Sequence, residues 1–298
     1  MTVFNTMSLS ARLSWLIVLV ITPVLGLVIF STYEQQQLRH KDVIELAVNT
    51  AHQIAENQSQ VIQRAEELLL TLSRLPAVRQ KDGERCNTLF SDLLPRYPQY
   101  LNLVAADTDG FIFCSARTLS KPLNVKDDPS FTRALNNRGF AMGELAFSQI
   151  NGRPYIGEGY PVLNDAGQVI AVVGAIMSVD WMNQEFARHK LPPNSTLTLF
   201  DGFGNIIAHA PGAEQWIGKT VKSSALLTTA MRGADSLELV DIDGVRRIHG
   251  FAQVQNSPFP SSYYVTLGLA SDHAFELWRL ALSRYVLLLL LVTALALI

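Results

Sequence analysis

The sequence predicts an α+β protein in which a long N-terminal helix precedes two tandem α/β subdomains, with an apolar segment at each end of the chain. Three observations predict this fold: an uncharged apolar run near the N-terminus, a helical stripe directly after it, and four strand–turn–strand patterns further on. The net charge is −2 and the basic residues are dispersed, which excludes a nucleic-acid-binding protein.

The two apolar segments are Leu13–Tyr33 and Tyr285–Ile298. The first spans about 20 uncharged residues, enough for one transmembrane helix, and exceeds the apolar core of a cleaved signal peptide. The second would cover only about 21 Å as a helix, so it is read as the start of a truncated second membrane helix. We expect residues 1–12 in the cytoplasm and an output domain beyond Ile298. A complete protein with a short hydrophobic tail is the alternative.

Residues 34–75 contain neither Gly nor Pro and are predicted to form one long helix. A heptad-like stripe of mostly apolar residues follows it, and Pro76 is expected to end it. Its small side chains favour packing against the helix's own domain or against a second copy in a dimer. The stripe consists of Ile44, Val48, Ala51, Ala55, Gln58, Ile62, Ala65, Leu69 and Leu72.

Four hairpins are predicted after the helix, each with Asp or Asn and Gly in its turn. They cover residues 101–116, 155–179, 196–210 and 237–254, and a final strand covers 263–269. Helical stretches at 130–137 and 223–231 separate the members of each pair. Similar strand–turn signatures begin at Leu101 and Leu197, so we predict a weak internal repeat of about 95 residues. Accidental similarity of ordinary hairpins is the alternative.

The chain has two cysteines, Cys86 and Cys114, both between the apolar segments. An even pair in an extracytoplasmic region predicts a disulfide, which would close a loop of about 28 residues and contribute ~3 kcal/mol. Two buried free thiols are the alternative. A disulfide would support a periplasmic location.

Catalytic signatures are missing from the sequence. It has no Gly-x-Ser-x-Gly, Gly-x4-Gly-Lys-Ser/Thr or His-Glu-x2-His motif, and its six histidines are scattered singly. The Asp241-x-Asp243-Gly244 run lacks the later ligands of a calcium loop and is read as a hairpin turn. We therefore predict no catalytic residue, no metal site and no cofactor.

Several stretches together resemble the double-Cache family, the paired PAS-like sensor modules of bacterial transmembrane receptors. The residues that carry the resemblance include Asn102–Ser115, Phe131–Gly143, Val173–Trp181 and Leu191–Ile207. It implies a membrane-distal PAS-like subdomain (76–180) that binds a small molecule and a membrane-proximal one (181–271).

The resemblance also implies a homodimer in the bacterial inner membrane, with residues 34–284 in the periplasm. The expected output is a cytoplasmic diguanylate cyclase, a histidine kinase or a chemotaxis signalling domain. The segment itself is then not an enzyme.

In PAS-like folds the ligand pocket lies between one sheet face and the helix that crosses it. The resemblance therefore implies that the pocket is lined by residues between 131 and 180. Strand alternation places Tyr155 on one face and Glu158 on the other, so both side chains cannot line one pocket. The candidate ligand-binding residues are Arg133, Phe147, Tyr155, Glu158, Tyr160 and Asp180.

The sequence departs from the amino-acid-sensing members of the family. Where those carry Arg-x-Trp-Tyr, this chain has Arg138-Gly139-Phe140-Ala141, and Asp127–Phe131 replaces an Asp-Arg-x-Tyr-Phe run. The missing Arg removes a clamp for a carboxylate, which argues against a carboxylate ligand. The mixture of aromatic residues with few charges favours a small, partly apolar or amine-bearing ligand over a phosphate. The alternatives are a protein-interaction or structural module without a small ligand, and a membrane-tethered periplasmic enzyme.

Overall fold

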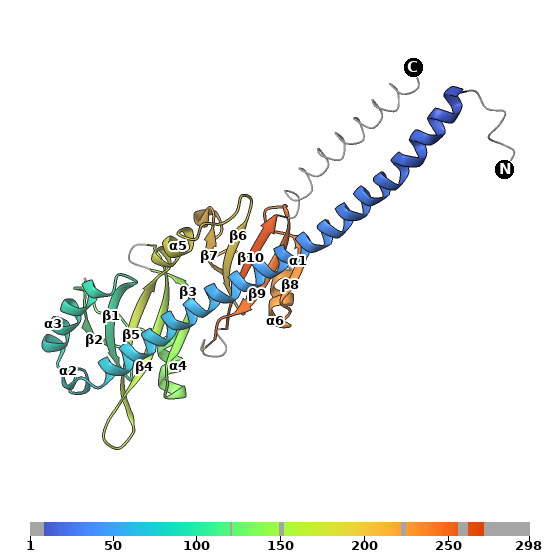
Figure 1. Ribbon diagram of the computed structural model, residues 1–298. Coiled ribbons are helices and arrows are strands. Elements are labelled where there is room, and N and C mark those ends of the chain that lie inside the picture. Colours follow the sequence, from blue (N-terminus) through green and yellow to red (C-terminus); the bar gives the residue numbers. More distant parts are fainter. Residues whose placement is uncertain (1–8, 120, 149–151, 222–224, 256–261, 271–298) are drawn as a thin grey trace.

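The computed structural model describes residues 9–119, 121–148, 152–221, 225–255 and 262–270. Helix α1 (Leu9–Ser73) runs along two five-stranded antiparallel sheets and extends well beyond them toward the N-terminus (Figure 1). The predicted α+β class, with a long N-terminal helix and two antiparallel sheets, is confirmed.

The two sheets share one topology. The distal sheet has the strand order β2-β1-β5-β4-β3, and the proximal sheet has the equivalent order β7-β6-β10-β9-β8. The distal elements are α2 (Pro76–Arg79), α3 (Gly83–Leu93), η1 (Leu94–Arg96), β1 (Tyr100–Asp107), β2 (Ile112–Ser115), α4 (Pro129–Asn137), β3 (Ala141–Phe147), β4 (Pro154–Leu163) and β5 (Val169–Ser178). The proximal elements are α5 (Val179–Ala187), β6 (Thr196–Asp201), β7 (Ile206–Ala210), η2 (Ala213–Gln215), α6 (Ala225–Met231), β8 (Ser236–Val240), β9 (Arg246–Gln253) and β10 (Tyr263–Ala270).

The apolar stripe of α1 packs against its own domain. Ala51, Ala55, Ile62, Ala65 and Leu69 are buried in one core that also includes side chains of both sheets. The close approach depends in part on a glycine of β9, because a Cβ at Gly250 would lie 2.3 Å from the main chain of α1. The helix therefore connects the two subdomains mechanically, and its small residues bring it against the sheets.

Three distal elements differ from the sequence prediction. The α1 helix ends at Ser73, and Pro76 occupies the first turn of α2, where its missing N–H is harmless. Helix α3 begins at an Asp82 cap that accepts a hydrogen bond from the Arg85 amide at 3.2 Å. Strand β3 was not predicted because its sequence, Ala-Met-Gly-Glu-Leu-Ala-Phe, contains no β-branched residue; its pairing with β4 imposes the extended conformation.

The predicted disulfide is confirmed: Cys86 of α3 bonds Cys114 of β2, with a Cα–Cα distance of 5.7 Å. Next to it, the Asn87 side chain accepts a hydrogen bond from the Ser115 amide at 2.7 Å. Because β2 is an edge strand of the distal sheet, the bond and the amide contact hold α3 against an edge that would otherwise be open to pairing.

The first apolar segment, Leu13–Tyr33, lies within α1 and is continuous with the predicted 34–75 helix. Among the residues that could be examined for it, no helix is both long and apolar enough to cross a membrane. The membrane helix at 13–33 stays a prediction, and the predicted segment at 285–298 lies outside the described residues.

Candidate functional site

A cavity of about 80 Å³ lies in the distal subdomain between helix α4 and the face formed by β1, β4 and β5. Its polar side chains include Asp128, Ser130 and Tyr155, and Phe131 and Val104 contribute apolar surface. Among the described residues that line it there is no Lys, Arg or His. The cavity is therefore small, largely apolar and acidic.

Asp128 is placed at the cavity by the start of α4. It is the N-cap residue, followed by Pro129 at the first helical position. Its Oδ1 accepts hydrogen bonds from the Ser130 amide at 2.8 Å and from the Ser130 hydroxyl at 2.5 Å. The hydrogen bonds that the described residues donate to the Asp128 carboxylate all go to Oδ1, so Oδ2 is available to a ligand.

Tyr155 lies close enough to Asp128 to sense its charge. Burial raises the pKa of the Tyr155 hydroxyl, and the negative charge of Asp128 raises it further. A phenol O–H that stays protonated and a carboxylate can both interact with a cation, the carboxylate by charge and the ring by its π face. The polar end of the cavity is thus suited to an ammonium group.

Glycines hollow out the cavity and keep α4 close. A Cβ at Gly157 would lie 2.7 Å from the Ser130 hydroxyl, and one at Gly159 would lie 2.9 Å from the Ser130 carbonyl oxygen. A Cβ at Gly174 of β5 would lie 2.9 Å from the carbonyl oxygen of Glu158. Any larger residue at these positions would fill the space or push the helix outward.

Glu158 lines the cavity through its position on β4. Its side chain follows that of Ile156 onto the opposite face, which packs around α1. The side chain is buried, and neither carboxylate oxygen has a hydrogen-bond partner among the described residues. Burial is the main cause that raises the pKa of this carboxyl, to about 8, and the nearby Tyr100 hydroxyl acts in the opposite direction.

The structure brings two of the six predicted residues, Tyr155 and Glu158, to the cavity. Arg133 instead forms an ion pair with Glu144 and donates a hydrogen bond to the Met142 carbonyl oxygen at 2.7 Å.

The other three predicted residues lie elsewhere. Phe147 is 55% exposed, and its ring lies close to Gly218 of the proximal subdomain. Tyr160 packs against the α1 core, and Asp180 is exposed in the first turn of α5.

The sequence prediction did not include Asp128, Ser130 or the three glycines. A signal for Asp128 was present, because an Asp followed by Pro before a helix is a typical N-cap sequence. No comparable signal existed for the glycines, since a glycine in a strand says nothing about which helix crosses it.

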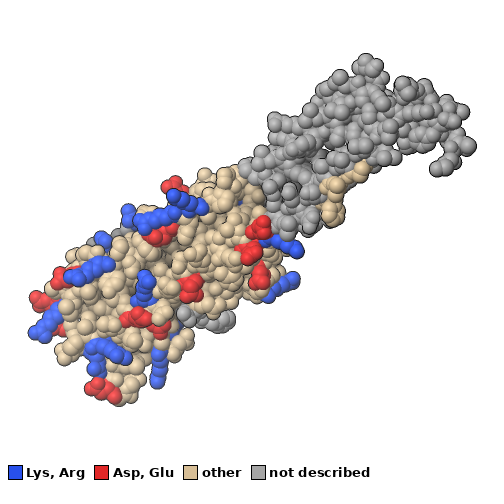
Figure 2. Space-filling view, viewed as in Figure 1, with Lys and Arg blue, Asp and Glu red and all other residues tan. Residues whose placement is uncertain are grey.

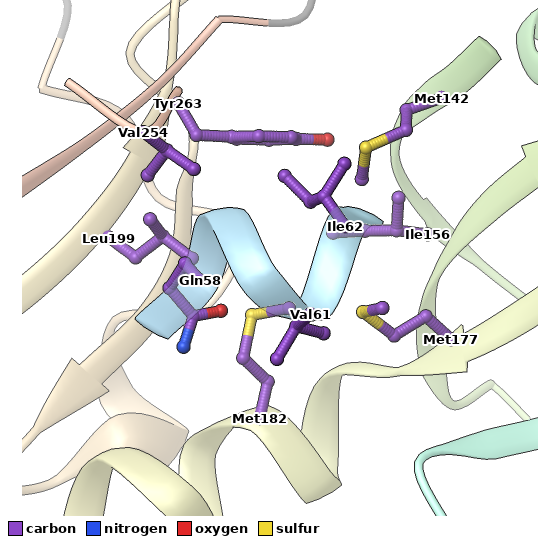
Figure 3. A pocket seen from close by; sticks show the side chains of 10 residues that line it. All are labelled: Gln58, Val61, Ile62, Met142, Ile156, Met177, Met182, Leu199, Val254 and Tyr263. Carbon is purple, nitrogen blue, oxygen red and sulfur yellow. The ribbon is translucent and has the colours of Figure 1, made fainter. Parts of the chain in front are cut away.

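A second cavity, of about 20 Å³, lies where the two subdomains meet on α1 (Figure 3). Met142, Met177 and Met182 surround it, with Gln58 of α1 and Tyr263 of β10. The Tyr263 hydroxyl donates a hydrogen bond to the Gly143 carbonyl oxygen at 3.2 Å, which links the subdomains directly. This space is large enough for about one water molecule, so it is part of a packed joint rather than a ligand site.

The surface charge is mixed. Figure 2 shows acidic and basic side chains interspersed over the described part of one face, where they form no broad basic patch.

Comparisons with known proteins identify the fold. No family model matches the sequence. No curated protein matches it either. Among solved structures, the extracellular domain of rpHK1S-Z16, a candidate histidine kinase, aligns with a TM-score of 0.69 at 18% identity, covering 80% of this chain and 98% of that one.

Two chemoreceptor domains are also similar. The ligand-binding domain of CtaA from Pseudomonas fluorescens, in complex with L-isoleucine, has a TM-score of 0.65 at 17% identity and covers 82% of this chain and 98% of its own. That of PctB from Pseudomonas aeruginosa PAO1, in complex with L-Arg, has a TM-score of 0.59 at 19% identity with the same coverage. At these identities the likeness establishes the fold alone, which is the paired-sheet, double-Cache fold that the sequence resemblance implied.

Proposed function

We propose that this chain is the extracytoplasmic ligand-sensing region of a bacterial transmembrane receptor, and that its distal cavity binds a small amine in its cationic form. The proposal rests mainly on the cavity itself. Asp128 and Tyr155 face a largely apolar space, and glycines of β4 and β5 form the sheet side of that space. The similarity to chemoreceptor domains crystallised with amino acids supports a small nitrogenous ligand.

A full amino acid is a poorer fit than a simple amine. Its carboxylate needs a cationic partner, ideally a bidentate Arg. Arg133 is paired with Glu144, and Arg138 is exposed. An apolar cavity of 150 Å³ holds a molecule the size of benzene, so a cavity of about 80 Å³ suits a shorter chain such as ethylammonium.

The signal would travel as a population shift. In this proposal, ligand binding draws α4 toward the sheet, and α1 packs on the other side of that sheet. A ligand that binds more tightly to one arrangement of α1 therefore increases the population of that arrangement. A coupling free energy of ~1–3 kcal/mol is typical of such systems.

In the full proposal the chain is a homodimer in the inner membrane with residues 34–284 in the periplasm, and it controls a diguanylate cyclase or histidine kinase. Reporter fusions at residues 12 and 280 would test this orientation.

A thermal-shift screen of the full chain in detergent micelles tests ligand binding. The panel is ethylammonium, isobutylammonium, L-isoleucine, L-arginine, acetate and phosphate. A ligand at a hundredfold excess over its Kd should add ~2.7 kcal/mol of stability. We expect the amines to raise the melting temperature and acetate and phosphate to leave it unchanged.

Two neighbouring aspartates provide a matched pair of variants. Asp128→Asn keeps an N-cap side chain for α4 but removes the charge, and it should abolish the shift. Asp127→Asn removes an exposed charge one residue away, and this variant should still show the increase in melting temperature with the amines. Shifts with the amino acids alone would contradict the preference for a simple amine. A flat screen with a folded protein would favour the protein-interaction alternative.

A further inference from the structure

Glu158 reaches both faces of strand β4. Its main chain lines the distal cavity between Gly157 and Gly159, neither of which carries a side chain into that space. Its own side chain lies on the opposite face with Ile156, in the core that packs around α1. A single residue therefore borders the ligand cavity and the long helix, with only the thickness of one strand between them.

Among the described residues, no charged side chain contributes to the pKa shift of the Glu158 carboxyl group. Its cross-strand neighbours are Met142 of β3 and Ala175 of β5, both buried. The titratable groups that interact with it are the phenols of Tyr100 and Tyr263. The α1 side chains of this core include Ile62, Ala65 and Leu69, which are apolar. The amide of Gln58 on α1 lies at the adjoining joint with Met142. Neither carboxylate oxygen accepts a hydrogen bond from a described residue.

This environment disfavours the ionised form, and the pKa of about 8 means that the group keeps its proton at neutral pH. A cation in the cavity would act in the opposite direction. It would lie one strand away in a poorly screened interior, where an opposite charge favours the carboxylate. Asp128 attracts the cation on the cavity side of β4, and the charge of the cation favours ionisation of Glu158 on the opposite side.

We propose that binding of a cationic ligand in the distal cavity is coupled to ionisation of Glu158, whose proton passes to the solvent. The inference rests on the proposed function and adds its regulation. The carboxylate that forms lies beneath α1 without a partner, so its ionisation favours an arrangement of the helix in which water or the Tyr100 hydroxyl solvates it. The ligand site and the signalling helix are thereby coupled through one side chain.

Isothermal titration calorimetry of the full chain in micelles with ethylammonium tests the proton release. An alkylammonium group stays charged across this range, since a primary amine has a pKa near 10.4, so the ligand itself releases no proton. Titrations at pH 7 in phosphate and in HEPES, neither of which is a primary amine and whose ionisation enthalpies differ, give the number of protons released. If the pKa of Glu158 falls by one unit on binding, about 0.4 proton is released per ligand. Affinity then rises by up to about tenfold between pH 6 and pH 9.

Glu158→Gln removes the titrating group, and it should bind ethylammonium with no buffer-dependent heat and a flatter pH profile. Glu66→Gln, which alters an exposed glutamate of α1, should behave as the wild type. The titration of the wild-type protein tests proton release by itself, so the coupling can be tested even if Glu158→Gln misfolds.

The outcomes separate the two proposals. Ethylammonium binding without proton release in the wild type, or with equal release in a folded Glu158→Gln protein, overturns the coupling and leaves the ligand site standing. If no amine binds the wild type, the proposed function fails and the coupling fails with it.

Discussion

The distal and proximal subdomains have the same sheet order, but the sheet faces beneath their crossing helices differ, and in the distal subdomain a cavity of about 80 Å³ lies between α4 and the sheet. The difference lies in one row of residues across three strands. In the distal sheet Val104 faces Gly174, which faces Gly159. In the proximal sheet the corresponding row is Thr198, Thr266 and Phe251.

The proximal sheet carries side chains that hydrogen-bond to one another. His209 Nδ1 lies 2.9 Å from the Thr198 hydroxyl, and His249 Nδ1 lies 3.0 Å from the Thr266 hydroxyl. Arg247 forms a buried ion pair with Asp241 at 3.0 Å. In the compared row, Thr198, Thr266 and Phe251 carry side chains where two of the three distal residues are glycines. The same sheet order is therefore compatible with either kind of face, and side-chain volume at a few strand positions sets the space beneath the crossing helix.

The buried titratable groups of the two subdomains also respond to pH in opposite ways. In the distal subdomain, burial raises the pKa of Glu158. In the proximal subdomain, burial lowers the pKa of His209 to about 4 and lowers that of His249 as well. The distal core is thus expected to weaken toward alkaline pH and the proximal core toward acid.

The largest expected effect is the loss of folding stability at alkaline pH. Protonated Glu158 is compatible with its apolar site, so its contribution to stability is full below the unfolded pKa of 4.5 and is lost as pH rises through about 8. The loss is on the order of 4 kcal/mol. Glu158→Leu should remove this dependence, as measured by urea unfolding of the full chain at pH 5 and pH 9. An equal alkaline loss in the leucine variant would show that another group is responsible.

The acid effect is expected to be next in size. Neutral His209 is favoured in the folded state, so its contribution is present above the unfolded pKa of 6.5 and is lost as pH falls toward about 4. The loss is on the order of 3 kcal/mol. His209→Gln keeps a hydrogen-bond partner for the Thr198 hydroxyl and should reduce the loss of stability at acid pH. Hydrogen exchange at pH 5 should show β7 losing protection before β1; the reverse order would contradict the comparison.

The smallest effect concerns the glycine row. Gly159→Ala places a Cβ 2.9 Å from the Ser130 carbonyl oxygen, and such overpacking typically costs about 1–3 kcal/mol. It should also remove ethylammonium binding by making the distal face more like the proximal one. Gly139→Ala is the control, because its Cβ would meet no atom nearer than 3.9 Å. Unchanged binding in Gly159→Ala would separate the cavity from the ligand site.

Much of the fold could be read from local sequence. Asp107 and Asp201 illustrate why: each accepts two main-chain hydrogen bonds within its own hairpin turn, so each turn is specified by residues that are adjacent in the chain. The long helix and the disulfide were predictable for similar reasons, since helical periodicity and a pair of cysteines are local or countable features. Strand β3 was missed because only its pairing with β4 makes it extended.

The site depended on contacts that the sequence does not record. Alternation along β4 showed that Tyr155 and Glu158 point to opposite faces, but it could not tell which face α4 covers and which face α1 covers. The tertiary structure decided this, and with it the roles of Asp128 at the cavity and of Arg133 in an ion pair. The physical reason is that hydrogen bonds within a turn or helix join near neighbours in the chain. A cavity, by contrast, is the space left between elements that are distant in sequence.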